Sequence, residues 1–375
     1  MTGENGPVRF GMIGGGNGAF IGAVHRAAMR LDGLCTLIAG ALSSSPERSL
    51  ASAEVLGLQR GYESWGAMLD GESALPAGER VEAVSIVTPN HLHAEQAVAC
   101  LDAGFHVVLD KPVATTVGDC KAIRDAAARS GRTVTVTYNY SGYPLVREAR
   151  ALVSSGAIGT VRRVQVEYLQ GWLAGDLEST GHKQARWRTD PDLAGAGALG
   201  DIGTHAEHLA AFVTGLRPTH VLADVASHVE RRRVDDDCCV LLRYGNGARG
   251  TLTVSQVCIG EENGLTLRVY GERGSLAWRQ ERPNALEHFT MDGERRVITR
   301  GSAASPAAAD ATRLPPGHPE GFHEAFANIY RGAADRVRGE HSSHELIAPT
   351  ITDGTQGVAF VEACLASGGT WTELG

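Results

Sequence analysis

The stretch VRFGMIGGGNGAFIGAVHRAAMRL, residues 8–31, decides the fold of this chain. A short apolar run leads into a glycine-rich turn, and the turn opens a helical pattern of apolar residues. Glycines at such a turn let the backbone approach a pyrophosphate, and the N–H groups of the following helix favour negative charge. The stretch therefore predicts a dinucleotide-binding unit with Gly22 as the third glycine of a widened loop, an ordinary strand-to-helix turn being the alternative. The predicted cofactor contacts here are Gly14, Gly16, Asn17 and Gly18.

Outward from this stretch, apolar runs and helical patterns alternate as far as residue 137. Continuous apolar strands separated by helices are typical of a parallel sheet covered on both faces, and right-handed crossovers make it doubly wound. From about residue 140 most runs alternate apolar with polar residues and are joined by turn sequences. We therefore predict an α/β Rossmann domain over residues 1–140. An α+β domain with a large, mostly antiparallel sheet, for substrate binding and oligomerisation, follows over 141–375, and a C-terminal helix packs back on the first domain.

Two polar segments of the second half are predicted to be loops. Arg231–Arg233 and Asp235–Asp237 flank one turn and are expected to form a solvated loop. Residues 301–316 are rich in alanine, serine and proline, which favours a long and mobile connection.

The composition excludes several classes of protein. Hydrophobic residues make up 43% of the 375 and charged residues 21%, which is typical of a globular and not of a disordered chain. The formal net charge of −8 argues against nucleic-acid binding through a broad positive surface. Neither a membrane span nor a signal peptide is readable, so the cytoplasm is the expected location. Seven scattered cysteines without C-x-x-C spacing predict reduced, buried thiols rather than disulfides or a zinc site.

The end of the second apolar run bears on which dinucleotide binds. Asp32 lies at the usual spacing for a ribose-binding acid, but it precedes this run, whereas that acid belongs at the carboxyl end. The carboxyl end reads ALSSSPERS over residues 41–49 and has no carboxylate before Glu47. Hydroxyl groups and a nearby cation suit either the ribose of NAD or the 2′-phosphate of NADP, so the cofactor is NAD or NADP. The residues expected to bind it here are Ser43, Ser44 and Arg48.

Two further turns follow neighbouring strands of the predicted parallel sheet. TPNHLH, residues 88–93, ends the fourth strand, and DKP, residues 110–112, ends the fifth. Ligands of open α/β sheets bind beyond the carboxyl ends of the strands, so both turns are expected beside the cofactor. A lysine at this edge is seldom structural, the alternative being an exposed lysine on a loop. The predicted contacts are Thr88, Pro89, Asn90, His93, Asp110 and Lys111.

The strongest motif is GAGALGDIGTH, residues 195–205. If Asp201 begins a helix, Asp201 and His205 lie one turn apart on the same face. A carboxylate beside an imidazole fixes its tautomer and supports its protonated form, as a general base requires. The alternative is a helix-capping aspartate with an unrelated histidine. A zinc site of His205, Glu207 and His208 is disfavoured because these side chains do not supply enough ligands on one face.

Together these motifs resemble the glucose–fructose oxidoreductase / inositol dehydrogenase / MocA family over nearly the whole chain. Two departures are the widened glycine loop and Asp110, where the family usually has glutamate. The stretches that are similar to the family are the glycine turn with His25, residues 88–93, residues 103–112, the turn SGAIG at 155–159 and residues 187–205.

The resemblance implies an NAD(P)-dependent oxidoreductase acting on a sugar, glycoside or cyclitol, with a cis peptide before Pro112. It implies a catalytic set of Lys111, Asp201 and His205. His205 takes the hydroxyl proton as hydride leaves for nicotinamide C4, and Asp201 orients the imidazole. Lys111 stabilises the developing alkoxide, so Lys111 and His205 are expected to converge over the nicotinamide ring. Further predicted substrate contacts, each with core packing as its alternative, are Tyr140, Trp172 and Arg188.

Three alternatives to a plain dehydrogenase remain. A non-catalytic NAD(P)-binding regulator would keep the glycine turn but would not need Lys111, Asp201 and His205. A glycoside-cleaving enzyme would oxidise a ring carbon, eliminate the aglycone and re-reduce the product. A reductase would use NADPH on a keto-sugar. The open antiparallel sheet favours a homodimer or homotetramer, and no nucleic-acid, membrane or metal partner is expected.

Overall fold

The computed structural model describes residues 6–374, which fall into two compact units. A segment far along the chain completes the first unit, so neither unit is one continuous stretch of sequence. The first unit runs to Ala114 and adds Gly118–Gly142 and Phe322–Gly354; the second comprises Thr115–Val117, Tyr143–Gly321 and the residues from Thr355 onward.

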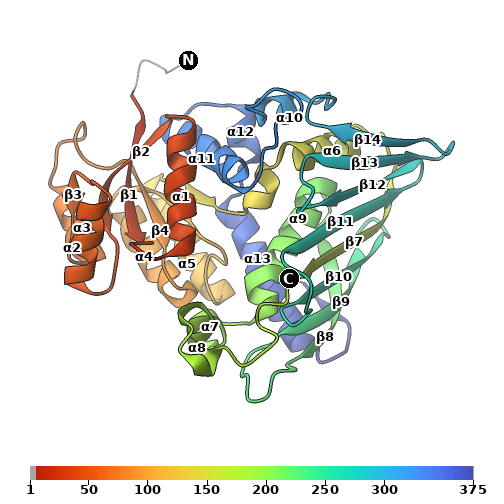
Figure 1. The fold of residues 1–375 in the computed structure, drawn as a ribbon, viewed down its shortest axis with the longest axis horizontal. Coiled ribbons are helices and arrows are strands. Elements are labelled where there is room, and N and C mark those ends of the chain that lie inside the picture. The colour runs from red at the N-terminus through yellow and green to blue at the C-terminus, as the bar shows by residue number, and fades with distance from the viewer. Residues whose placement is uncertain (1–5, 375) are drawn as a thin grey trace. The chain divides into compact units, whose positions relative to one another are not determined.

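Six parallel strands form the sheet of the first unit in the order β3-β2-β1-β4-β5-β6 (Figure 1). The order reverses between β1 and β4, which is where ligands of doubly wound sheets bind. The predicted Rossmann fold is therefore confirmed. The strands are β1 Val8–Gly14, β2 Cys35–Ala41, β3 Arg60–Gly61, β4 Ala83–Val87, β5 His106–Leu109 and β6 Val134–Val136. The helices are α1 Phe20–Leu31, α2 Pro46–Val55, α3 Trp65–Ser73, α4 His93–Asp102, α5 Val117–Ser130, α11 Phe322–Arg338 and α12 Ser343–Ile347.

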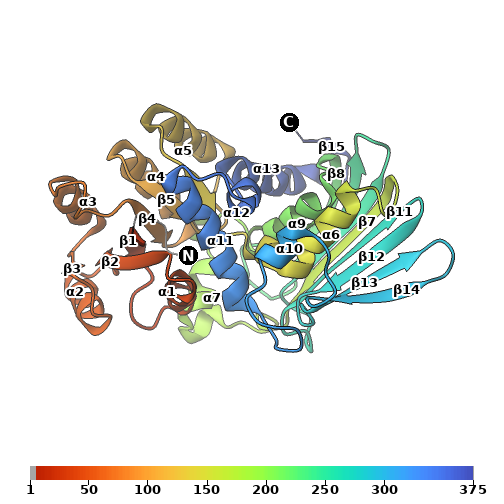
Figure 2. The ribbon, with the colours of Figure 1, turned by 90° about the horizontal axis from the view of Figure 1, so that it is seen from above.

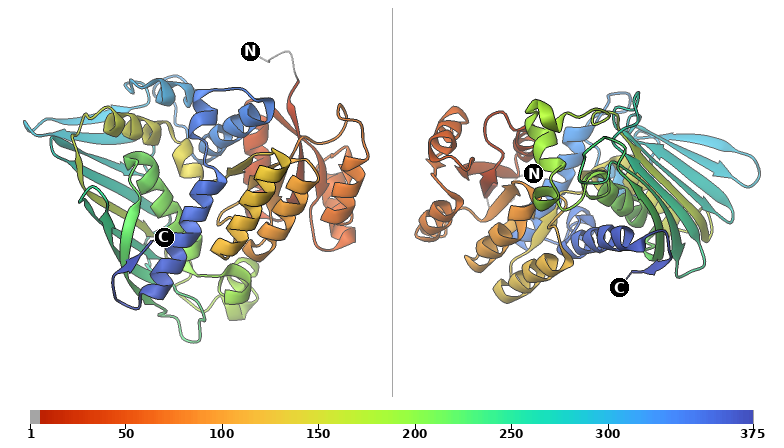
Figure 3. Two further views of the ribbon diagram at one scale, coloured as in Figure 1. Left: turned by 180° about the vertical axis from the view of Figure 1, so that it is seen from behind. Right: turned by 90° about the horizontal axis from the view of Figure 1, so that it is seen from below.

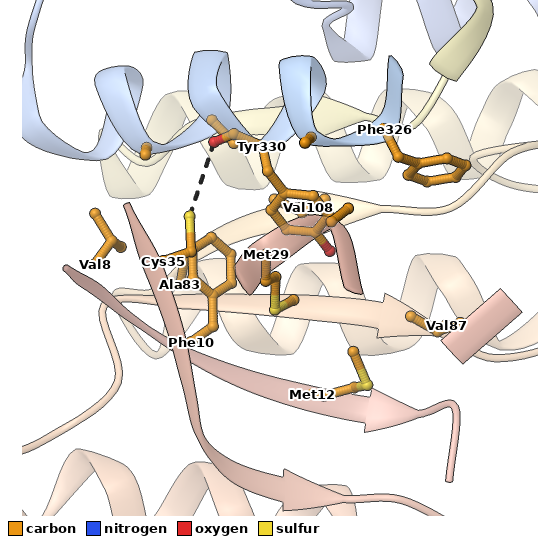
Figure 4. Close-up of a cluster of buried hydrophobic side chains, with 14 of the residues drawn as sticks. Val8, Phe10, Met12, Met29, Cys35, Ala83, Val87, Val108, Phe326 and Tyr330 are labelled. Carbon is orange, nitrogen blue, oxygen red and sulfur yellow. Dashed lines mark hydrogen bonds between the residues drawn. The ribbon is translucent and has the colours of Figure 1, made fainter. Parts of the chain in front are cut away.

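Helices α1 and α11 cover one face of this sheet and α4 the other (Figures 2 and 3). Alternate residues of β1 point into a cluster shared with both α1 and α11 (Figure 4). The rings of Phe10 and Tyr330 meet edge to face there, with centroids 5.6 Å apart. Phe326 and Tyr330 of α11 are buried in this cluster, so α11 is part of the core of this unit. Each fully buried large apolar side chain contributes about 1.5–3 kcal/mol to folding. The labelled members are Val8, Phe10, Met12, Met29, Cys35, Ala83, Val87, Val108, Phe326 and Tyr330.

Nine strands form the sheet of the second unit, in the order β14-β13-β12-β11-β7-β10-β9-β8-β15. Neighbours are antiparallel except β7 and β10, which confirms the mostly antiparallel sheet. The strands are β7 Val161–Leu169, β8 Pro218–Ala226, β9 Asp237–Tyr244, β10 Arg249–Ser255, β11 Gly264–Gly271, β12 Gly274–Arg279, β13 Ala285–Thr290, β14 Arg295–Thr299 and β15 Thr372–Glu373. The helices are α6 Pro144–Ser154, α7 Lys183–Arg188, α8 Pro191–Ala194, α9 Thr204–Thr214 and α10 Pro306–Asp310, and α13 Ile351–Ser367 begins in the first unit.

Helices α6 and α9 pack on one face of this sheet (Figure 2). Strand β9 shows the resulting alternation, because Cys238 and Val240 are buried whereas Cys239 and Leu241 are exposed. Cys239 is therefore an exception to the predicted burial of the cysteines. Among the described residues, no helix is long and apolar enough to cross a membrane.

Two loop predictions for this unit need correction. Arg232, Asp235 and Asp236 are buried, so their segment is not a solvated loop, although Arg231 and Arg233 are exposed. The Arg232 side chain is fully buried because its guanidinium pairs with Glu178 and Asp236 and donates to two backbone carbonyls. A charge run predicts solvent only when its members lack such partners.

The predicted loop over residues 301–316 contains helix α10. The buried carboxylate of Glu148 accepts the N–H groups of Ala304 and Ser305, just before this helix begins. The carboxylate of Glu320 accepts the N–H groups of Arg313 and Leu314 after it. The segment is therefore built around two buried acids that lie outside it in sequence.

Candidate active site

The glycine turn after β1 is closely packed by backbone on several sides. Gly14 and Gly15 have φ of +76° and +67°, in the region that favours glycine. A Cβ on Gly14 would lie 2.5 Å from the Val87 carbonyl oxygen, and one on Gly16 would lie 2.6 Å from that of Leu42. A Cβ on Gly22, the third glycine of the sequence motif, would lie 2.2 Å from the Gly15 carbonyl oxygen. The backbone of α1 at Gly22 therefore packs directly against the backbone of the turn at Gly15.

The start of α1 suits an anion. Its N-cap residue Ala19 provides no side-chain hydrogen bond, and its first turn carries no acid, so the helix N–H groups are not capped by the residue before them. The Asn17 N–H donates to the Ser52 hydroxyl at 3.2 Å, and the buried Arg26 donates to the Gly15 carbonyl, which fixes the shape of the loop. Sequence reasoning missed Ser52 and Arg26, since neither belongs to a glycine motif. The close packing of these glycines brings the turn against a helix start whose N–H groups have no side-chain cap, and this arrangement fits a dinucleotide pyrophosphate.

The loop after β2 is shaped by serine hydroxyls. Ser45 caps α2 by accepting the N–H of Arg48 at 3.3 Å, and its hydroxyl donates to Glu47, which lowers the pKa of that carboxyl. The Ser43 hydroxyl accepts the Ser45 N–H at 3.2 Å, whereas the neighbouring Ser44 and Arg48 are exposed. Asp32 directly follows α1 and therefore precedes β2, as expected. Its carboxylate pairs with Arg331 at 3.7 Å.

The turns after β4 and β5 are joined by one histidine. His93 is buried, and its Nδ1 lies 2.8 Å from the Pro112 carbonyl oxygen while its Nε2 lies 2.8 Å from that of Thr88. Both partners accept hydrogen bonds, but a neutral imidazole has only one N–H. Burial lowers the pKa of His93, although both carbonyls and Asp110 act in the opposite direction. Predicted as a cofactor contact, His93 thus ties the two turns together within the first unit.

The turn after β5 carries the predicted catalytic lysine. Lys111 is half-buried and precedes a cis peptide bond to Pro112, as the family resemblance implied. The Asp110 carboxylate accepts the N–H of Lys111 and the hydroxyl of Thr137, each at 2.8 Å, so it holds the backbone at the lysine. Thr88 donates its hydroxyl to Gln96 at 2.7 Å, while Pro89 and Asn90 lead into α4.

A buried polar chain runs behind these turns in the first unit. His25 Nδ1 lies 2.7 Å from the Tyr330 hydroxyl, which lies 2.8 Å from the Ser85 hydroxyl. The Nε2 of His25 lies 3.9 Å from the Asp110 carboxylate, and burial lowers the pKa of this histidine. Tyr330 could not be assigned here from sequence, because α11 lies far along the chain from His25 and Ser85.

The predicted acid and base of the second unit lie on one helical segment. Asp201 lies inside a π-helical turn, Leu199–Gly203, and His205 lies in the first turn of α9. The expectation that Asp201 begins the helix is wrong, because its own N–H already donates to the Gly197 carbonyl at 2.8 Å. Single π-turns within helices are frequent at functional sites. His205 is buried, and its ring lies 6.3 Å from that of Tyr168.

Two polar side chains hold the Asp201 carboxylate. Gln256, the residue after β10, donates its amide to Asp201 Oδ2 at 2.9 Å. The Arg188 guanidinium pairs with the same oxygen at 3.4 Å and stacks over the Trp187 ring at 4.2 Å. Arg188 was predicted as a substrate contact, and here it neutralises Asp201. Sequence reasoning missed Gln256, which no motif singles out.

The other predicted substrate contacts lie in different units. Tyr140 is buried in the first unit, in a short 3-10 turn after β6. Trp172 lies in the second unit, where its indole N–H donates to Gln170 at 3.0 Å and its ring lies 6.2 Å from that of His182. Over residues 6–374 the side chains form no group of three or more that could hold a metal ion.

Known proteins match this chain along most of its length. One family model, an oxidoreductase family with an NAD-binding Rossmann fold, matches residues 8–138, and a GFO/IDH/MocA C-terminal domain matches residues 146–277. The uncharacterized oxidoreductase YfiI of Bacillus subtilis is 32% identical over 98% of this chain and 97% of its own. A levoglucosan dehydrogenase of Pseudarthrobacter phenanthrenivorans is 29% identical over 74% of this chain and 75% of its own. An inositol dehydrogenase homologue of Azotobacter vinelandii, solved in complex with NAD+, is 34% identical with a TM-score of 0.93, covering 98% and 97% of the two chains.

Proposed function

This chain belongs to the GFO/IDH/MocA family of oxidoreductases, and we propose that it transfers hydride between a secondary alcohol of a sugar, glycoside or cyclitol and a nicotinamide dinucleotide. The alcohol carbon loses a hydride to nicotinamide C4 and its hydroxyl loses a proton to the protein, which leaves a ketone or lactone. The reverse reaction returns both.

The observation that carries the proposal is the glycine turn of the first unit. A backbone that excludes every Cβ at Gly14, Gly16 and Gly22, followed by a helix start without a side-chain cap, suits a pyrophosphate. Bound there, the dinucleotide would supply hydride acceptance, and the turns after β4 and β5 lie at the same carboxyl edge of the sheet.

The second unit supports an acid–base role for Asp201 and His205. A hydroxyl group is too weak an acid to lose its proton unaided at neutral pH, so a base must take the proton as hydride leaves. An imidazole has an ordinary pKa near 6.5, which suits that role. We assign the proton to His205 and the orientation of its imidazole to Asp201, whose carboxylate already has Gln256 and Arg188 as fixed partners.

Lys111 is proposed to stabilise the alkoxide that develops during hydride loss. An ammonium group favours the negative oxygen of the transition state more than the neutral hydroxyl of the ground state. The Asp110 carboxylate and the His93 tie hold the backbone on either side of this lysine, so its stem starts from a defined position.

The substrate class is proposed from the relatives. An inositol dehydrogenase homologue and a levoglucosan dehydrogenase are named for polyhydroxylated rings. Such rings carry several secondary alcohols and have an apolar C–H face that suits an aromatic side chain such as Trp172.

The proposal is tested by a screen of sugars, glycosides and inositols with NAD and NADP, followed by the absorbance of the reduced nicotinamide. Turnover of at least one class is expected, and paired titrations of the two cofactors decide what the serines after β2 select. Absence of turnover with every alcohol and both cofactors would contradict the dehydrogenase. A cofactor that never leaves the protein during glycoside cleavage would instead favour oxidation followed by elimination.

A further inference from the structure

One aspartate of the second unit holds three consecutive N–H groups at the start of the helical segment that carries Asp201. Asp235 accepts the Gly197 N–H at 2.7 Å through Oδ1 and the Leu199 N–H at 2.6 Å through Oδ2. Its carbonyl oxygen accepts the N–H of Ala198 at 2.9 Å. The first N–H groups of a helix lack partners within it and favour a negative charge. Asp235 therefore caps this helix from a distant part of the chain.

The contact is too close for any side chain at Gly197. A Cβ on Gly197 would lie 1.8 Å from the Asp235 carbonyl oxygen. Asp235 is buried, so water does not replace it as the partner of these N–H groups. Asp235 therefore fixes the position of the π-helical turn that contains Asp201.

The next residue continues the connection to the Asp201 side chain. The Asp236 carbonyl accepts the Gln256 N–H at 2.8 Å, and the Gln256 amide donates to Asp201 Oδ2 at 2.9 Å. Asp236 is itself fixed, because its carboxylate accepts the N–H groups of His228 and Val229 and pairs with Arg232. Asp235 thus holds the backbone of the segment that carries Asp201, and Asp236 holds the Asp201 carboxylate through Gln256.

We propose that Asp235 and Gln256 are positioning residues for Asp201 and His205, an inference that rests on the proposed acid–base role of that pair. Asp235 fixes the backbone that carries both side chains, and Gln256 fixes which way the Asp201 carboxylate points. A displacement of about 1 Å at a reacting group costs on the order of a hundredfold in rate, so loss of either contact should affect the chemistry more than binding.

Three substitutions disturb the contacts that hold Asp201. Asp235→Asn keeps the shape but replaces one of the two oxygens that accept the Gly197 and Leu199 N–H groups with an NH2 donor. Asp235→Glu keeps a carboxyl group and moves it, and Gln256→Leu removes the hydrogen bond to Asp201 without changing any charge. Asp237→Asn is the matched control, since Asp237 follows two residues after Asp235 and lies instead 3.9 Å from His228. Melting temperatures of all four variants establish that they are folded.

The first readout needs no turnover. The pKa of His205 is measured by NMR on protein with labelled histidines, with its signal identified by its loss in His205→Asn. We expect all three test variants to lower this pKa by about half a unit or more, because a displaced Asp201 no longer supports the imidazolium. Asp237→Asn should leave it unchanged. Folded variants that all retain the wild-type pKa of His205 would overturn the proposal.

The second readout is kinetic, with a substrate from the screen deuterated at its carbinol carbon. We expect kcat to fall about tenfold to a hundredfold and the isotope effect on kcat to rise, while the affinity for NADH stays unchanged. A structural role alone would reduce the active fraction without changing the isotope effect. If the Asp235 variants do not fold, Gln256→Leu decides the matter. A His205 pKa that moves in a protein without any turnover would support the positioning and contradict the redox function.

Discussion

The candidate site residues of the two units are held in different ways. In the first unit, Gly15 meets Gly22, and His93 joins the turns of Thr88 and Pro112, all within a short stretch of chain. In the second unit, the segment around Asp201 is held by Asp235 and Gln256, residues far along the sequence that the sheet brings back to it. The contacts just named for the first region follow local strand–turn–helix geometry, although Asn17 also bonds to the distant Ser52, whereas those of the second region depend on the topology of a sheet. Substitutions in the turns of the first unit should therefore disturb neighbouring residues, whereas the segment around Asp201 should respond to substitutions at residues distant in sequence.

The largest expected effect concerns the remote contacts. Arg232→Ala should lower the free energy of unfolding by about 3–5 kcal/mol, because it leaves the buried Asp236 and the partly buried Glu178 without their cation. Chemical denaturation of the purified protein measures this.

The neighbouring Arg231→Ala is the control, since Arg231 is exposed and pairs with the exposed Glu230. It should change stability by less than about 0.5 kcal/mol. Equal effects of the two substitutions would mean that the buried network does not support the second unit.

The next effect falls on the lysine of the first unit. Lys111→Ala should lower kcat by about 10²–10³-fold, a barrier increase of about 3–4 kcal/mol, with cofactor affinity little changed. Steady-state kinetics with a substrate from the screen measures it. Lys121→Ala removes an exposed lysine that pairs with Asp125 in α5 and should have no effect. A loss confined to KM would contradict stabilisation of the transition state.

A smaller effect tests the closeness of the glycine turn. Gly22→Ala places a methyl group 2.2 Å from the Gly15 carbonyl oxygen. The turn must shift, so we expect a loss of about 1–3 kcal/mol in stability and at least a tenfold weaker NADH affinity by fluorescence titration.

Gly66→Ala in helix α3 is the matched control, because its nearest neighbour, the Ser64 hydroxyl, would be 4.0 Å away. It should be neutral or slightly stabilising, since alanine is the better helix former. Unchanged NADH affinity in Gly22→Ala would show that the turn does not bind the pyrophosphate.

A further effect is a pH dependence of stability in the first unit. Burial, with Arg132 nearby, lowers the pKa of His106 to about 4, and burial also lowers the pKa values of His25 and His93. Below about pH 6.5 the unfolded chain binds protons that the folded chain does not. The free energy of unfolding should therefore fall as the pH drops from about 6.5 to 4, by at most about 1.4 kcal/mol per pH unit for each histidine.

His106→Asn should make this slope shallower in denaturation experiments across that pH range. An unchanged slope would show that His106 is protonated equally in the folded and unfolded states.

Much of the fold could be predicted because local patterns determine it. The alternation of strands and helices predicted as far as residue 137 is observed, since a buried run or an amphipathic helix repeats one pattern over its length. Strand β14 shows no such pattern, because it is largely exposed and has no apolar run. The two-residue strands β3 and β15 are too short to show any pattern.

The site was predictable only where chemistry and sequence spacing coincide. The glycine turn and the lysine turn could be identified because strand ends determine where such residues lie. Asp235 was interpreted as solvated because no sequence pattern indicates its partners. These are the N–H groups of residues 197 and 199. Gln256 was not considered for the same reason.

The central claim is that this chain moves hydride from an alcohol carbon to nicotinamide while His205 takes the hydroxyl proton. It is tested by incubating the protein with NAD and an active alcohol deuterated at its carbinol carbon, and by measuring deuterium at C4 of the reduced cofactor with mass spectrometry and NMR. We predict deuterated cofactor with the wild-type protein and almost none with His205→Asn, which should still bind NADH normally. Cofactor reduced without deuterium, or wild-type rates in His205→Asn, would contradict the account.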